Sequence, residues 1–454
     1  MRYRTINPTT EEQLEVFDCH SDDLVEGMVM ASVRGFGEWR RRSPRERGAL
    51  LTEAASLLER EAATLAETMA IEMGKPLAQG RAEAFKCALG CRYYAENGEA
   101  FLVDDPRSSD GSRSYVRCDP LGPVLAIMPW NFPFWQFYRF AAPALIAGNT
   151  VLLKHSPNTP RCALAIEDLM LRAGFPRGVV QNLFLSNEQA GRLIADERVR
   201  GVTLTGSTRA GKQVAQAGGK HLKPTVMELG GSDPFIVLDD ADVDRAVEVG
   251  VDARCQNSGQ SCIAAKRFLV HRCVADSFRE GFVAAMQQRV VGDPTDAGVE
   301  IGPLARADLR ETLVKQVART TTAGASVLCG GKRPEGRGFF YPPTVLAEVP
   351  AGTPAAEEEL FGPVATLTVI EDDDEAIELA NSIRYGLGAS LWTRDVERAQ
   401  RLIPEIEAGS VFVNGPVKSD PRLPFGGVKQ SGFGRELARE GMMEFVNLKT
   451  VWFA

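Results

Sequence analysis

The chain has 454 residues, enough for two or three domains, and its 44% hydrophobic and 25% charged residues are ordinary for a globular protein. A net charge of −8 lacks the basic footprint of a nucleic-acid-binding protein, and an anionic substrate would need a local cation. Nine cysteines without a CxxC pair, and four histidines without HExxH spacing, argue against a disulfide framework and against a metal site.

The N-terminal part of the chain has a helical pattern. Between about residues 22 and 100, Ala, Leu and Glu are abundant, and apolar residues recur three and four positions apart. Within this region Ser43-Pro44-Arg45-Glu46 predicts a helix start, with serine as the N-cap, proline at the first position and glutamate at the third.

From residue 112 onward, apolar strand-like runs alternate with helical runs. Residues 112–118 alternate in the manner of a strand. The alternation that follows predicts a doubly wound parallel sheet, with strands at 121–128, 150–153 and 202–205 and helices at 135–147 and 161–173. The pattern then restarts with a strand at 235–238, a helix capped by residues 239–244 and a strand at 267–270. We therefore expect a second α/β domain, with the boundary near residues 228–232.

A glycine-containing turn follows the predicted strand at 202–205. Gly206-Ser207-Thr208-Arg209-Ala210-Gly211 opens a helix, as a phosphate-binding turn does, because a helix N-terminus presents free N–H groups. The segment lacks the three glycines of the Rossmann fingerprint. From the residues alone, a phosphate site and a plain strand–helix turn are equally good interpretations.

One cysteine has the setting of a nucleophile. Cys262 follows the turn-forming Asn257-Ser258-Gly259 and precedes Ile263-Ala264-Ala265, which predicts a thiol at the junction between a loop and a buried element. Backbone N–H groups at such a junction would lower the thiol pKa and favour attack on a substrate. The alternative is a small core cysteine, since free cysteine is among the most buried residue types.

Two further polar residues are candidates for the same chemistry. Glu228 lies among Val226, Met227 and Leu229, and burial there would raise its pKa and suit it to act as a general base. Asn131, in Met128-Pro129-Trp130-Asn131-Phe132-Pro133, carries an amide that can donate to an oxyanion. The structural alternatives are a strand end at Glu228 and a turn at Asn131.

Together these segments resemble the aldehyde dehydrogenase superfamily. The resemblance covers nearly the whole chain, from Ile6-Asn7-Pro8 through Glu72-Met73-Gly74-Lys75-Pro76 to Pro424-Phe425-Gly426-Gly427-Val428-Lys429. Within the superfamily, Lys154-His155-Ser156-Pro157-Asn158 and Glu228-Leu229-Gly230-Gly231-Ser232-Asp233-Pro234 are most like the shorter, bacterial type of succinate-semialdehyde dehydrogenase.

The resemblance implies two α/β domains and a small β element for oligomerisation. We expect the dinucleotide-binding domain in residues 1–102 and 121–228, and the catalytic domain in residues 229–430. The oligomerisation element would combine residues 103–120 and 431–454, and its hydrophobic Thr450-Val451-Trp452-Phe453 predicts an edge strand that needs a partner. A homodimer or a homotetramer is expected.

The resemblance also assigns a cofactor site. It places the pyrophosphate at Gly206 and Ser207, and it assigns the remaining contacts to Trp130, Lys154, His155, Ser156, Pro157, Leu229, Glu359 and Phe361. Relatives that prefer NAD often carry glutamate three residues after the lysine, where this chain has Pro157. Without that carboxylate, Lys154 is free to pair with a 2′-phosphate, which favours NADP, with NAD as the alternative.

For the substrate, the resemblance implies a carboxylate-bearing aldehyde. Arg139 and Ser419 match residues that bind the carboxylate, whereas a second arginine of some relatives is replaced here by Gln256. Trp135, Phe132 and Phe425 are candidates for an apolar wall around the substrate methylenes.

The expected reaction is oxidation of succinic semialdehyde to succinate through a thioester on Cys262. The alternatives are a broader aldehyde dehydrogenase, a CoA-acylating semialdehyde dehydrogenase, and a non-catalytic binding or structural protein. The charged start of the chain lacks the apolar core of a signal peptide, and no apolar run is long enough to span a bilayer. These features predict a cytoplasmic protein without membrane contact.

Overall fold

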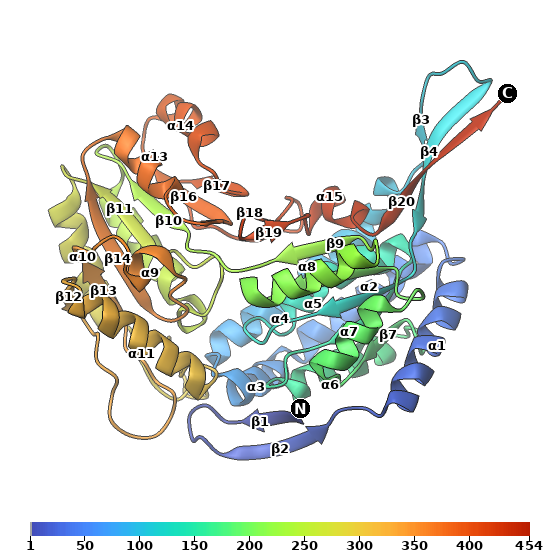
Figure 1. Cartoon of the computed structure of the whole chain (residues 1–454), viewed down its shortest axis with the longest axis horizontal. Helices are drawn as coiled ribbons and strands as arrows, with labels where there is room; N and C mark the ends of the chain where they lie inside the picture. Colours follow the sequence, from blue (N-terminus) through green and yellow to red (C-terminus); the bar gives the residue numbers. More distant parts are fainter. Residues whose placement is uncertain (1) are drawn as a thin grey trace.

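The computed structural model describes residues 2–454, and the strands of its two largest sheets form two separate α/β units (Figure 1). The first sheet has six strands in the order β19-β9-β8-β5-β6-β7. Its strands are β5 (Pro123–Ile127), β6 (Thr150–Lys154), β7 (Val180–Asn182), β8 (Gly201–Thr205), β9 (Thr225–Glu228) and β19 (Gly432–Phe433). All neighbours are parallel except β19 and β9.

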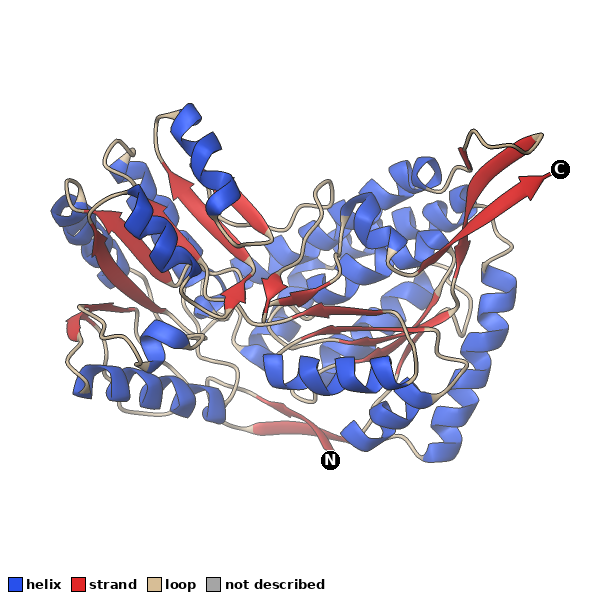
Figure 2. Cartoon of the chain, turned by 45° about the horizontal axis from the view of Figure 1, so that its top comes forward, coloured by secondary structure: helices blue, strands red, loops and turns tan. Residues whose placement is uncertain are grey.

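Helices lie on both sides of this sheet (Figure 2). The helix predicted after Ser43 is confirmed, since the Glu46 N–H donates to Ser43 Oγ at 3.2 Å and the Ser43 N–H donates to the Glu46 carboxylate at 2.7 Å. The helices of this unit are α1 (Asp22–Trp39), α2 (Pro44–Arg60), α3 (Ala62–Met73), α4 (Leu77–Phe101), α5 (Trp135–Ala147), α6 (Pro160–Arg172), α7 (Asn187–Ala195) and α8 (Thr208–Lys220).

The second sheet has seven strands in the order β12-β13-β14-β11-β10-β16-β17. Only the β12–β13 pair is antiparallel. The strands are β10 (Pro234–Val237), β11 (Arg267–His271), β12 (Ser326–Cys329), β13 (Thr344–Ala347), β14 (Val364–Ile370), β16 (Gly388–Trp392) and β17 (Ser410–Val413). The predicted fold class, two doubly wound α/β units, is confirmed.

Helices and short 3-10 turns surround this second sheet. They are α9 (Val243–Cys255), η1 (Gln256–Gly259), α10 (Ala275–Gln287), α11 (Ala307–Thr322), α12 (Pro354–Glu357), α13 (Asp373–Asn381), α14 (Val396–Leu402) and η2 (Ile403–Glu405). Two small sheets complete the fold: the hairpin of β1 (Arg2–Ile6) and β2 (Gln13–Asp18), and the pair β15 (Tyr385–Gly386) and β18 (Val428–Lys429).

A three-stranded arm projects from the first unit and carries the C-terminus at its tip (Figure 1). Its order is β20-β4-β3, with β3 (Asp105–Pro106), β4 (Arg113–Pro120) and β20 (Val446–Phe453) all antiparallel. The predicted division differs from this arrangement within residues 431–454. There β19 extends the first sheet and α15 (Ala438–Met443) packs against α5, so of these elements only β20 belongs to the arm.

The two units meet where β9 of the first sheet ends and β10 of the second begins. Only residues 229–233 connect the two strands. The carboxyl end of the first parallel sheet therefore faces the amino end of the second. No helix within residues 2–454 combines the length and the apolar character needed to cross a membrane.

Candidate active site

The junction between the units brings Glu228 and the Cys262 loop together. Glu228 is the last residue of β9, and Cys262 lies between η1 and β11. The backbone of Gly231 packs directly on this loop, because a β-carbon at Gly231 would lie 2.7 Å from the Cys262 carbonyl oxygen. The general base and the nucleophile predicted from separate motifs thus share one site.

A left-handed turn shapes the loop before Cys262. Asn257, Ser258 and Gly259 have φ values of 54°, 56° and 74°, and such values are unusual for residues other than glycine. The predicted turn is confirmed. Only glycine fits at position 259, because a side chain there would overlap the Gly362 carbonyl group.

Lys266 fixes the other side of the loop. Its buried ammonium group donates to the carbonyl oxygens of Ser261, Cys262 and Ala264 at 2.9, 2.8 and 3.1 Å. Residues 262–264 form a turn and a bend, so the apolar residues from Ile263 do not open the buried element. β11 begins at Arg267, as the strand predicted at 267–270 indicated. The sequence interpretation missed Lys266, although two basic residues directly before the apolar run 268–270 signal buried cations that need acceptors.

The side-chain amide of Asn131 faces the same loop. Its Nδ2 donates to the Gln260 carbonyl at 3.0 Å, which uses one of its two N–H groups. The backbone carbonyl of Asn131 accepts from Lys75 Nζ at 2.8 Å and from Asn257 Nδ2 at 2.7 Å. The remaining amide N–H has the chemistry needed to donate to an oxyanion at Cys262.

A buried ion pair holds the Asn131 loop in place. Lys75 pairs with Glu83, and Glu83 also accepts from the backbone N–H groups of Phe134 and Trp135, both at 2.9 Å. The Lys75 ammonium group lies 3.9 Å from the centre of the Phe132 ring. This network connects α4 to the start of α5, and it explains why a charged motif at Lys75 lies in a buried position.

The electrostatics of the thiol differ from the sequence prediction. Burial raises the pKa of Cys262 to about 12, and the positive charges of Arg139 and Lys266 offset only part of this effect. The expected lowering of the thiol pKa is therefore wrong for the ligand-free protein. At neutral pH the thiol keeps its proton until ligand binding lowers the thiol pKa or a base removes the proton.

The environment of Glu228 agrees with a general base. Burial raises the pKa of its carboxyl group well above the ordinary value, and the charge of Arg139 opposes this shift. Oε1 of Glu228 is buried without a hydrogen-bond partner within residues 2–454. A carboxylate with a raised pKa is a stronger base than an ordinary carboxylate, and its free oxygen can accept a proton from water.

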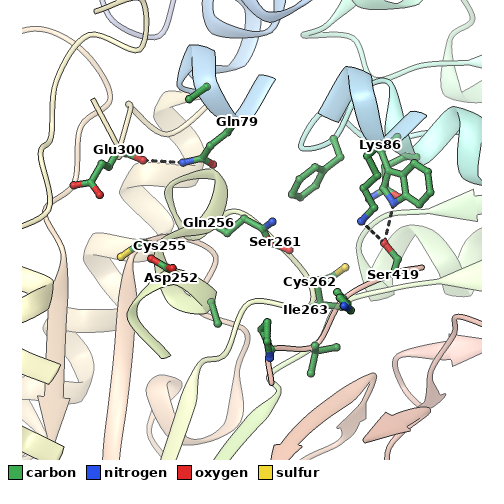
Figure 3. A pocket seen from close by; sticks show the side chains of 18 of the residues that line it. Gln79, Lys86, Asp252, Cys255, Gln256, Ser261, Cys262, Ile263, Glu300 and Ser419 are labelled. Carbon is green, nitrogen blue, oxygen red and sulfur yellow. Dashed lines mark hydrogen bonds between the residues drawn. The ribbon is translucent and has the colours of Figure 1, made fainter. Parts of the chain in front are cut away.

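A cavity of about 380 Å³ adjoins Cys262. Figure 3 shows the Cys262 sulfur pointing toward the same open space as Lys86 and Ser419. Every residue predicted to contact the substrate lines this cavity, namely Phe132, Trp135, Arg139, Gln256, Ser419 and Phe425. Lys86 of α4 also lines it, and no sequence motif pointed to this lysine.

Arg139 lines the cavity, and an acidic side chain pairs with its guanidinium group. It is buried on α5 and forms an ion pair with the buried Glu436. It also donates to Thr205 Oγ1 at 3.2 Å, and its guanidinium group lies 4.7 Å from the centre of the Phe425 ring. Glu436 was not predicted, and its presence reduces the net charge that Arg139 offers to an anionic substrate.

The candidate cofactor residues gather at the point where the strand order of the first sheet reverses. The chain proceeds from β5 to β6 on one side and returns to β8 on the other, and ligands of such sheets bind at this switch point. Gly206 follows β8 there, and Ser207 caps α8 by accepting from the Ala210 N–H at 3.3 Å. Thr208 Oγ1 is buried without a partner in the described residues, so this helix start has an unused donor for a phosphate.

The residues predicted around the nicotinamide also lie together. Trp130 and Phe361 make an edge-to-face contact with ring centres 5.7 Å apart. Glu359 accepts from the Gly231 N–H at 3.1 Å, beside the linker that carries Leu229. Leu229 packs under α8, where a β-carbon at Gly211 would meet its side chain.

The segment after β6 contains residues that are available to a cofactor and one residue that has a structural role. Lys154 forms no ion pair within residues 2–454, and burial lowers its pKa to about 8. Ser156 and Pro157 are half-buried. His155 is fully buried between the Pro133 carbonyl at 3.0 Å and the Ser156 N–H at 2.8 Å, so it holds the loop and has no ring nitrogen left for a cofactor.

Comparisons with known proteins agree with this geometry. The sequence profile of the aldehyde dehydrogenase family matches residues 1–451. The chain is 50% identical to the probable succinate-semialdehyde dehydrogenase [NADP(+)] of Synechocystis, and 50% identical to succinate-semialdehyde dehydrogenase [NADP(+)] 1 of Mycobacterium tuberculosis, over 100% of each chain. It is also similar to the crystal structure of succinic semialdehyde dehydrogenase from Streptococcus pyogenes in complex with NADP+, with a TM-score of 0.97, 38% identity and 99% coverage of both chains.

Proposed function

Since this chain belongs to the aldehyde dehydrogenase family, we propose that it oxidises succinic semialdehyde to succinate with NADP. The observation that carries the proposal is the meeting of Cys262, Glu228 and Asn131 at one domain junction, beside a cavity that contains cationic side chains. The relatives named above act on the same aldehyde.

In the first half of the reaction, the Cys262 thiol loses its proton to solvent, and the sulfur attacks the aldehyde carbon. The free N–H of Asn131 and the Cys262 backbone N–H stabilise the oxyanion that forms. Lys266 holds the loop that carries Cys262, and the Lys75–Glu83 pair holds the loop that carries Asn131. Bound NADP supplies the hydride acceptor, so that the aldehyde carbon reaches the oxidation level of a thioester.

In the second half, Glu228 takes a proton from water, and the resulting hydroxide attacks the thioester. The Cys262 thiolate is expelled and takes the proton that Glu228 removed from water, and the product leaves as succinate after its acid proton is lost to solvent. A CoA-acylating enzyme would pass the acyl group to a thiol instead and would not need this base. The presence of Glu228 at the junction therefore favours hydrolysis.

The chain's residues fit NADP better than NAD. Lys154 has no acidic partner in the described residues, and position 157 carries no carboxylate to repel a 2′-phosphate. The free hydroxyl of Thr208 at the start of α8 suits the pyrophosphate, which both coenzymes share, so it does not distinguish between them.

We expect Pro157→Glu to shift the coenzyme preference toward NAD. Like charges near contact in a partly wet site cost about 1–4 kcal/mol, which changes the ratio of kcat/KM with NADP to that with NAD by tenfold or more. Pro157→Gln is the matched control, since it changes the backbone and size equally without adding charge. Equal ratios in the two variants would mean that selectivity resides elsewhere.

A panel of aldehydes tests the proposed substrate. Succinic semialdehyde should give a higher kcat/KM than butanal, which has the same number of carbons and no carboxylate. Each is assayed with NADP and with NAD by the absorbance of the reduced coenzyme. Equal values for the two aldehydes would reduce the assignment to a general aldehyde dehydrogenase.

We also propose that the arm of β3, β4 and β20 joins subunits into a homodimer or homotetramer. One edge of β20 is unpaired, and its Leu448, Trp452 and Phe453 are exposed. Exposed apolar edge strands favour pairing with another chain. Light scattering on the purified protein measures the mass directly, and a monomer at micromolar concentration would contradict the proposal.

A further inference from the structure

We propose that Lys86 and the hydroxyl group of Ser419 bind the substrate carboxylate, and that Lys86, rather than Arg139, supplies the charge. This inference rests on the proposed function, because it assumes a carboxylate-bearing aldehyde in the cavity beside Cys262. Lys86 and Ser419 come from α4 and from the segment after β17, and both line that cavity (Figure 3).

The hydrogen bonds around Ser419 leave its proton unused. Ser419 Oγ accepts from Lys86 Nζ at 2.8 Å and from Trp135 Nε1 at 2.9 Å. A serine hydroxyl has two lone pairs and one proton, so both acceptor positions are occupied. Within residues 2–454 it donates to no acceptor. The site therefore has a hydroxyl group that can only donate, as an anion requires.

Lys86 carries a charge without a counter-ion. Its ammonium group lies 4.6 Å from the centre of the Trp135 ring and forms no ion pair within the described residues. Only one of its three N–H groups is used, by Ser419. A partly buried ammonium group with free donors costs free energy unless an anion approaches it.

The other cations of the cavity are neutralised or exposed. Arg139 pairs with Glu436, and Arg289 pairs with Asp252 and Glu300, both at 2.6 Å. Lys418 is exposed, so water screens its charge. Gln256, at the position of a second arginine in some relatives, is neutral. Lys86 is thus the partly buried cation of this cavity that lacks an acidic partner in the described residues.

Replacing Lys86 with methionine tests the inference. Lys86→Met keeps the length of the side chain and its packing on Trp135 but removes the charge. We expect kcat/KM for succinic semialdehyde to fall by about ten- to a hundredfold, as for the loss of a charge-assisted hydrogen bond. Butanal does not use the contact, so its kcat/KM should change less than about threefold. Its turnover also shows that the variant is folded.

Two controls separate a specific contact from a general charge effect. Lys418→Met removes one positive charge from the same cavity at its exposed rim, and it should leave the ratio of the two substrates unchanged. Lys86→Arg keeps a cation at the site and should recover most of the preference for the carboxylated aldehyde.

The pH dependence of the substrate preference gives an independent readout. Burial, together with the charge of Arg139, lowers the pKa of Lys86 to about 8, whereas Cys87, Glu83 and Asp420 act in the opposite direction. As the pH rises through this value, Lys86 loses its charge, so the ratio of kcat/KM for succinic semialdehyde to that for butanal should fall. In Lys86→Arg the ratio should stay level, because arginine does not titrate in this range.

The outcomes distinguish the inference from the proposed function. If wild-type protein prefers succinic semialdehyde and Lys86→Met loses that preference, the inference holds. If wild-type protein shows the preference and Lys86→Met retains it, the inference is overturned and the proposed function stands. If wild-type protein shows no preference, the carboxylate site is overturned together with the proposed substrate.

Discussion

Replacing Cys262 with alanine should reduce formation of the reduced coenzyme by at least about 10⁴-fold, since it removes the nucleophile on which the covalent route depends. The change removes one sulfur atom from a half-buried side chain, and the loop is held through its backbone by Lys266. The fold and the binding of NADP, measured by calorimetry, should therefore persist.

A matched control is Cys273→Ala, which removes an exposed thiol from the turn between β11 and α10. We expect this variant to retain wild-type kcat. Appreciable turnover by Cys262→Ala would mean that another group, or no covalent group, carries the reaction.

Replacing Glu228 with glutamine should block the reaction after the thioester has formed. Glutamine has nearly the size and shape of glutamate but cannot act as a base, so the packing should survive while the proton transfer is lost. Rapid mixing should show a burst of reduced coenzyme close to one equivalent per active site, followed by a steady state about 10²–10⁴-fold slower than that of wild-type protein.

The size of this burst reports on a second role of Glu228. The thiol of Cys262 keeps its proton in the ligand-free protein, because burial raises its pKa to about 12. A full burst means that the thiol loses its proton without the help of Glu228. A lost burst would mean that Glu228 also accepts this proton, and an unchanged steady state would remove Glu228 from the mechanism.

Local features of the fold were predictable because they depend on residues close together in sequence. The cap at Ser43 and the turn at 257–259 follow from the preferences of serine, proline, asparagine and glycine. The two sheets could be predicted from the strand-like runs, because buried parallel strands are apolar along their length. Cys262, Glu228 and Asn131 were predicted as site residues from their motifs and the family resemblance.

The long-range contacts of the buried and partly buried charged side chains were not predictable in the same way. Lys86 and Ser419 are 333 positions apart, and Arg139 meets Glu436 from the other end of the chain. No spacing in the sequence encodes such contacts, which depend on how α4 and α5 pack. The thiol pKa was mispredicted for a related reason, since burial by distant segments outweighs the local N–H groups.

Mass spectrometry of a trapped intermediate tests the central claim most directly. Glu228→Gln is mixed with succinic semialdehyde and NADP, quenched in acid and digested. We predict that the peptide containing Cys262 gains the mass of one succinyl group, and that the gain is absent when Cys262 is also changed to alanine. An unmodified Cys262 peptide after a full burst of reduced coenzyme, or a succinyl group on another residue, would contradict the covalent route through Cys262.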